Sequence, residues 1–317
     1  MLTKNINSVF FSKANLVFKM VLFLLILTIL ATVVGFAIIA PISKGVRADI
    51  TEVGIGYKFG RYVEASITGE NVEVARQELI DAIYKIDDVI DAWPGEVVGT
   101  VIAFIFVMAL FGIIYFMSYY SLSDILNHFM SSNSHYGFGA NLIANARKSV
   151  IFALWYVLYT LGIYGIGFTI SIALGLVIGR VSALFGLFVM YLLALGTLAL
   201  RRALTAFWLP GIVTLGLNSR DSFYKNFELL KGRFWKTFGA YFMLYIISFV
   251  LLVLATFVTF GVAALFMFAA IWLYFEIRDM VCFYHVNGMK YYIDEQTVVN
   301  PKKLYKDAIL DDENFTL

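Results

Sequence analysis

Two apolar stretches, each about twice as long as a bilayer requires, constrain this chain more than any other feature. Residues 149–200 contain one charged residue, Arg180, and residues 238–275 contain none. An α-helix rises about 1.5 Å per residue, so about 20 apolar residues cross a hydrocarbon core of roughly 30 Å. Each stretch therefore predicts two spanning helices joined by a turn, the first turn near residues 175–180 and the second near residues 259–261.

Two further apolar segments are each long enough to cross once, and the composition agrees with a membrane protein. Hydrophobic residues make up 61% of the 317 residues and charged residues only 15%, which excludes an ordinary soluble domain. We therefore expect an all-α integral membrane protein with six transmembrane helices arranged as three hairpins. The six predicted spans are 20–40, 97–119, 149–173, 181–201, 238–258 and 261–283.

The distribution of basic residues predicts the orientation. Seventeen lysines and arginines fall in the segments 1–19, 120–148, 201–236 and 276–317, against seven in 41–96 and at Arg180. Cytoplasmic segments carry the excess of basic residues. We expect a multi-pass protein of the cell membrane with both termini in the cytoplasm. An amphipathic N-terminus (1–19), a loop (120–148), a connector (202–237) and a tail (284–317) would be cytoplasmic, and a small segment (41–96) would lie outside.

The outer segment 41–96 is the largest polar region before the second span. Its eleven acidic and six basic residues are too few for a catalytic domain of its own. Residues 71–92 place Leu79, Ile83, Ile86 and Ile90 on one helical stripe. Apolar residues alternate with glycines and a lysine over 53–59, which indicates a short strand. We expect this segment to act as a small cap that can bind a protein partner.

The stretch 201–238, which contains the connector between the fourth and fifth spans, holds seven basic residues and two acidic ones. Pro210 should kink or stop the helix that precedes it. Residues 222–235 then predict an amphipathic helix with Phe223, Phe227 and Phe234 on one face. An aromatic face beside basic residues suits a helix in the headgroup layer, so these three are candidate lipid-facing residues. The alternative is a connector packed on neighbouring helices.

Charged residues inside spans are costly and mark candidate sites. Glu276 and Asp279, three residues apart on one helix face, fall near the inner end of the last span together with Arg278. We expect them to form a structural ion pair between helices with Arg201, Arg202 or Arg233. A cation or proton site is the alternative.

The sequence predicts no catalytic, metal-binding or cofactor-binding residues. His128, His135 and His285 lack metal-ligand spacing, and phosphate-binding and hydrolase motifs are missing from the sequence. Asp124 and His128 share a helix face, which indicates a local hydrogen bond, or else the site of a lipid-modifying enzyme. Gly175 and Gly179, and Ser182 and Gly186, follow the small-xxx-small pattern of closely packed membrane helices.

Residues 150–290 resemble the family named for the membrane domain of glycerophosphoryl diester phosphodiesterases. The resemblance rests on Pro210 after a span, on the turn formed by Leu229, Lys231, Gly232 and Trp235, and on the ending Tyr274, Glu276 and Arg278. It implies a six-span prokaryotic membrane protein and implies little about activity, because the catalytic domain that gives the family its name has no counterpart in this sequence. The outer segment 41–96 departs from the family pattern.

We therefore expect a non-enzymatic membrane protein of the cell envelope that binds membrane lipids or a protein partner and does not bind nucleic acid. A transporter or channel for a small solute is the alternative. It would need a polar pathway, and Tyr119, Tyr156 and Glu276 are among the few candidates for lining one.

Overall fold

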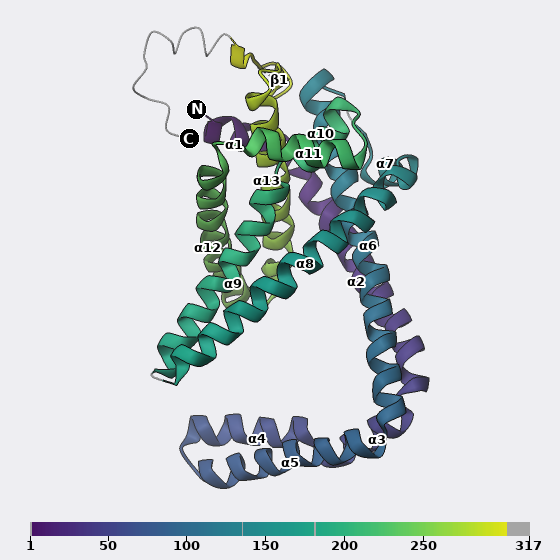
Figure 1. Ribbon diagram of the computed structural model, residues 1–317, viewed down its shortest axis with the longest axis vertical. Coiled ribbons are helices and arrows are strands. Elements are labelled where there is room, and N and C mark those ends of the chain that lie inside the picture. Colours follow the sequence, from purple (N-terminus) through teal and green to yellow (C-terminus); the bar gives the residue numbers. More distant parts are fainter. Residues whose placement is uncertain (1, 135, 181, 303–317) are drawn as a thin grey trace. The chain divides into compact units, whose positions relative to one another are not determined.

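The computed structural model describes residues 2–134, 136–180 and 182–302, and Figure 1 shows their path. Apart from one short strand pair, the regular elements of these described residues are helices, which confirms the all-α class. The chain divides into two compact units, Ile26–Phe111 and the remainder, Met1–Leu25 with Gly112–Leu317.

Five segments of the described residues are long and apolar enough to cross a membrane. They are Asn15–Ile42, Pro94–Ser132, Ala146–Gly179, Phe185–Leu215 and Phe234–Thr259. The sixth predicted span corresponds to helix α13, Val262–Val286, whose second half carries Glu276, Arg278 and Asp279. These charges make α13 too polar to be recognised by composition alone, so the sixth span stays a prediction.

The larger unit contains most of the helices and the strand pair. In chain order these are α1 (Leu2–Ser12), the start of α2 (Asn15–Ile42), the second half of α6 (Pro94–Ser132), α7 (Phe138–Ala144), α8 (Ala146–Gly179), α9 (Ala183–Thr205), α10 (Trp208–Leu215), α11 (Ser219–Leu230), α12 (Phe234–Thr259), α13 (Val262–Val286), β1 (Tyr291–Tyr292) and β2 (Val298–Val299). The strands are antiparallel, with Tyr291 opposite Val299.

The hairpin of α8 and α9 is held by glycines. The two helices lie side by side in Figure 1. A Cβ atom on Gly186 would lie 2.5 Å from the Cα atom of Gly179 and 2.6 Å from the carbonyl oxygen of Gly175. Since real Cβ contacts are longer, the two backbones approach as only glycine permits, which confirms the predicted small-residue packing.

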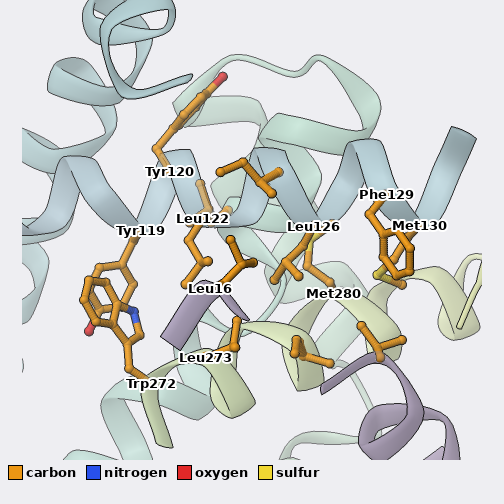
Figure 2. Close-up of a cluster of buried hydrophobic side chains, with 14 of the residues drawn as sticks. Leu16, Tyr119, Tyr120, Leu122, Leu126, Phe129, Met130, Trp272, Leu273 and Met280 are labelled. Carbon is orange, nitrogen blue, oxygen red and sulfur yellow. The ribbon is translucent and has the colours of Figure 1, made fainter. Parts of the chain in front are cut away.

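The core of this unit lies where the start of α2, the second half of α6 and α13 meet (Figure 2). Leu16, Leu126 and Leu273, one from each helix, are at most 3% exposed. At the break between α1 and α2, Lys13 lies over the ring of Phe129, with the ammonium nitrogen 3.6 Å from the ring centre. Burial lowers the pKa of Lys13.

Helix α6 extends thirteen residues beyond the predicted end of the second span, so the prediction of a loop from residue 120 is wrong up to Ser132. The polar residues that suggest a loop are buried by tertiary contacts. Ser121 donates a hydrogen bond to the carbonyl oxygen of Phe138, and Asp124 accepts hydrogen bonds from Asn141 and Asn145. A helix whose polar side chains find such partners does not need to end at the membrane surface.

The predicted break at Pro210 is displaced, because α9 ends at Thr205 and Pro210 lies in the first turn of α10. Proline is tolerated there, since the first amide groups of a helix have no intrahelical acceptor. Asn226 of α11 satisfies the backbone at the break: its side chain accepts from the Phe207 amide at 2.9 Å and donates to the Leu204 carbonyl oxygen at 2.7 Å.

Asn226→Ala should lower the free energy of unfolding by about 2 kcal/mol, because two buried backbone groups would lose their partner. Asn218→Ala is the matched control. Asn218 is exposed and accepts the Asp221 amide hydrogen at the start of α11, so its loss should cost about 1 kcal/mol or less. Thermal melting of both variants in one detergent measures the difference, and equal melting temperatures would contradict the role of Asn226.

The smaller unit contains the end of α2, then α3 (Lys44–Val53), α4 (Ile55–Thr68), α5 (Val72–Ala92) and the start of α6. The helix predicted at 71–92 is confirmed, and the strand predicted at 53–59 is wrong. A lone strand would leave its backbone groups unpaired, whereas a helix pairs them locally. Gly54, with a φ of 65°, ends α3 and begins α4.

Candidate functional site

A buried ion pair network joins α9 to α13. The Arg202 guanidinium lies 2.7 Å from Glu276 Oε1 and 2.5 Å from Asp279 Oδ2. All three side chains are at most 5% exposed. Glu276 and Asp279 can both face Arg202 because residues three apart share one side of a helix. The structure thus brings together three of the six candidate ion-pair residues.

Helix α6 supplies a third contact to this network. The Ser123 hydroxyl donates a hydrogen bond to Glu276 Oε2 at 2.9 Å, so Glu276 uses both oxygens, one toward α9 and one toward α6. Sequence reasoning missed Ser123, because its position falls in the expected loop. No sequence signal singles out Ser123, because which hydroxyl of α6 meets Glu276 depends on how α6 packs against α13.

Arg201 points to a different set of partners from those of Arg202. Its guanidinium donates to the Tyr156 hydroxyl and lies 5.3 Å from the Tyr156 ring centre and 5.6 Å from that of Tyr164, both on α8. Arg201 is 5% exposed. Among the described residues, no carboxylate lies within ion-pair distance of it, and its Nε has no hydrogen-bond partner.

The remaining candidate arginines lie apart from this ion pair. Arg278 is half-buried, with its guanidinium carbon 3.9 Å from the ring centre of Tyr241 on α12, a cation–π contact. Arg233 is exposed, just before α12 begins. Neither forms an ion pair with Glu276 or Asp279 in the described part of the chain.

A small cavity of about 10 Å³ borders the ion pair. Arg202, Glu276 and Asp279 line it, together with Tyr119 and Tyr156 and with Phe152, Thr205, Leu209 and Pro210. Asp279 Oδ1 has no hydrogen-bond partner among the described residues. A cavity of this size holds about one water molecule, and a water there could bond to this oxygen.

The predicted amphipathic helix 222–235 is divided in the structure. Helix α11 ends at Leu230, Gly232 adopts a φ of 75°, and Phe234 begins α12. The ring of Phe223 packs 4.7 Å from that of Trp208, between ring centres, whereas Phe227 is 39% exposed. Phe234 stacks on Phe238 of its own helix. The three phenylalanines therefore do not form one face of one helix.

Asp124 lies in a separate polar cluster beside α7. Its Oδ2 accepts from Asn141 at 2.6 Å and from Asn145 at 3.1 Å, and it lies 3.6 Å from His128 Nδ1. These two hydrogen bonds link α6 to α7 and to Asn145, the residue between α7 and α8. His135, the third histidine with His128 and His285, lies outside the described residues, as does the tail from residue 303.

No group of three or more potential metal ligands occurs among the described residues.

No model of a known protein family, no curated protein and no solved structure matches this chain. The resemblance noted for residues 150–290 therefore stays a prediction. The helices themselves show an all-α protein with several segments that are long and apolar enough to cross a membrane.

Proposed function

We propose that this chain is a six-span, non-enzymatic protein of the cell membrane, with both termini in the cytoplasm, that binds the headgroup of an anionic phospholipid at Arg201. The observation that carries the proposal is the buried, unbalanced positive charge of Arg201. The large apolar side chains exposed along α2, α6, α8 and α12 are consistent with contact to lipid.

Counting Arg201 itself, the buried and half-buried arginines here outnumber the buried carboxylates by one. Arg201, Arg202 and Arg278 lie within the same group of helices as Glu276 and Asp279, and both carboxylates bind Arg202. Burying a cation without an anion is costly, and the rings of Tyr156 and Tyr164 offset only part of that cost. A ligand that brings a negative charge would stabilise this arrangement.

The position of Arg201 favours a lipid phosphate as that ligand. Arg201 lies at the end of α9 that the excess of basic residues assigns to the cytoplasm. Anionic lipids are concentrated in the cytoplasmic leaflet, and basic pockets between helices on that side bind their headgroups. Tyr164 and Tyr245 are half-buried, so a headgroup would reach Arg201 by displacing side chains at the surface rather than backbone.

The ion pair network of Arg202, Glu276 and Asp279 gives less support to the alternative that the chain transports a solute than to lipid binding. The cavity beside Glu276 and Asp279 has room for about one water molecule, which is too small for a solute. A flux assay in proteoliposomes is the direct test. Uptake of a solute that is lost in Asp279→Asn and retained in the exposed-acid variant Glu228→Gln would favour transport over lipid binding.

Lipid retention by the purified chain tests the proposal. Native mass spectrometry should find anionic phospholipid bound to the full-length protein after detergent extraction. Arg201→Gln should reduce this retention by roughly tenfold or more, since a charge-assisted hydrogen bond contributes about 1.5–3 kcal/mol. Arg220→Gln, which removes an exposed arginine, is the matched control and should retain the lipid.

The folding of the variant must be checked separately. Arg201→Gln removes the hydrogen bond to the Tyr156 hydroxyl and the contacts with two tyrosine rings, but it also removes the cost of burying a charge without a carboxylate partner. Because these two effects oppose each other, its melting temperature in detergent should stay close to that of the wild type. If the folded Arg201→Gln protein retains as much anionic lipid as Arg220→Gln, Arg201 does not bind the headgroup.

A further inference from the structure

The α4–α5 hairpin of the smaller unit is held together by small residues. The two helices are antiparallel and are joined by three residues. Ala65 of α4 and Ala75, Ala82 and Val89 of α5 are each at most 8% exposed, as expected for the side on which the two helices pack. On one side of this contact, Arg61 and Glu78 form an ion pair at 2.8 Å. The hairpin thus has one side marked by a cross-helix ion pair.

The opposite side of the hairpin is apolar. We name it the apolar face and define it by the residues that helical spacing places there: Ile55, Phe59, Tyr62 and Val63 of α4 and Leu79, Ile83, Ile86 and Ile90 of α5. Phe59 is 57% exposed, Val63 40%, Ile83 53% and Ile90 41%. Side chains of this size left uncovered in a contiguous group mark an interaction surface.

Two acidic residues of α5 lie on the side away from the apolar face. Asp81 and Asp88 are exposed on the far side of α5 from Ile83 and Ile90. Segment 41–96 carries eleven acidic residues against six basic ones. A hydrophobic face opposite a strongly polar one is the pattern of a helix in the plane of a membrane interface.

The hairpin is fixed close to the ends of two candidate spans. Only Ser43 separates α2 from α3, and only Trp93 separates α5 from α6. The Glu96 carboxylate accepts the amide hydrogens of Gly45 at 2.8 Å and Val46 at 3.1 Å, and Trp93 Nε1 donates to Asp49 at 2.8 Å. These contacts join the base of the hairpin to the point where α2 ends and α6 begins.

We propose that the α4–α5 hairpin lies on the surface of the bilayer that α2 and α6 enter, with its apolar face in the boundary between headgroups and acyl chains. The bilayer is the occupant because tethering at both ends keeps the hairpin beside it. Apolar side chains are also exposed at the ends of the two spans, where Ile42 and Val98 are 36% and 58% exposed. The acidic far side stays in water, and the negative net charge favours a zwitterionic over an anionic leaflet.

Site-specific labelling in nanodiscs tests this position. Four variants of the full-length chain, each with one added cysteine on a Cys282→Ala background, carry an environment-sensitive fluorophore. Phe59→Cys and Ile83→Cys label the apolar face, and Asp81→Cys and Asp88→Cys label the far side as matched controls. The discs contain phosphatidylcholine, with or without spin-labelled acyl chains, and one protein chain each.

The expected result is quenching by the spin-labelled lipid that is several-fold stronger at positions 59 and 83 than at positions 81 and 88. Equally weak quenching at all four positions would overturn the proposal. So would labels at 59 and 83 that are shielded from water but not quenched by lipid, or that become shielded only in discs loaded with two chains, since a second copy would then be the occupant.

Discussion

Arg202→Leu should lower the free energy of unfolding by about 3–5 kcal/mol, the cost of leaving buried charges without their partner. Glu276 and Asp279 are at most 5% exposed, and Arg202 is their shared partner. Its loss would place the two carboxylates side by side without their cation. Among the described residues, Ser123 alone would still donate a hydrogen bond to one of them. The measurement is thermal and denaturant unfolding in one detergent, with the exposed variant Glu228→Gln as the control, for which a change below about 1 kcal/mol is expected.

The triple variant Arg202→Leu, Glu276→Leu, Asp279→Leu separates the cost of an unpaired charge from the value of the intact network. Replacing a whole buried ion pair with apolar residues is often neutral or stabilising, so the triple variant should recover much of the stability lost in the single variant. A single variant that melts like Glu228→Gln would mean that the network contributes nothing to holding α9 and α13 together.

Gly186→Leu should be the most disruptive single change in the α8–α9 hairpin. A Cβ atom at this position would already meet the Cα atom of Gly179 at 2.5 Å, and a backbone atom cannot turn aside as a side chain can. Overpacking a well-packed contact costs about 1–3 kcal/mol. Leucine adds four carbon atoms at a backbone contact, so we expect a loss of about 4 kcal/mol or a failure to fold.

The control for this prediction lies on the facing helix. A Cβ atom on Gly165 of α8 would meet no atom within 4 Å, so Gly165→Ala should be neutral or should stabilise the helix by up to about 1 kcal/mol. Gly186→Ala gives an intermediate step, with one added methyl group. If Gly186→Ala and Gly165→Ala melt at the same temperature in detergent, the close approach of the two backbones is not needed for stability.

The positions of the helical hairpins could be predicted from the sequence because they depend on length and charge alone. The turns after α8 and α12 lie near Arg180 and Phe260, where a double-length apolar stretch must reverse. The extension of α6 could not be predicted, because whether Asp124 lies in a loop or a helix depends on Asn141 and Asn145, which reach it only in the folded chain.

An ion pair between helices could be predicted from the sequence, but the arginine that forms it could not. Sequence spacing places Glu276 and Asp279 on one face and predicts a basic partner among the arginines of 201–236. The choice of Arg202 over Arg201 depends on how α9 is turned about its axis, which the uniformly apolar surface of that helix does not encode. The division of the predicted helix 222–235 at Gly232 was missed because the aromatic spacing continues across a residue that adopts a positive φ.

The adjacent arginines of α9 have a consequence for how this helix is oriented. In water, the apolar side of a helix turns inward because exposure is costly, but lipid tails are as apolar as leucine, so that preference disappears in a bilayer. Consecutive residues point about 100° apart around a helix. Arg202 meets two carboxylates on α13, and Arg201 meets two tyrosine rings on α8. Rotating α9 about its axis by one residue would turn Arg202 away from the carboxylates and Arg201 away from the tyrosine rings. The two arginines therefore fix the rotation of α9 about its axis, which apolar packing against lipid alone would not determine.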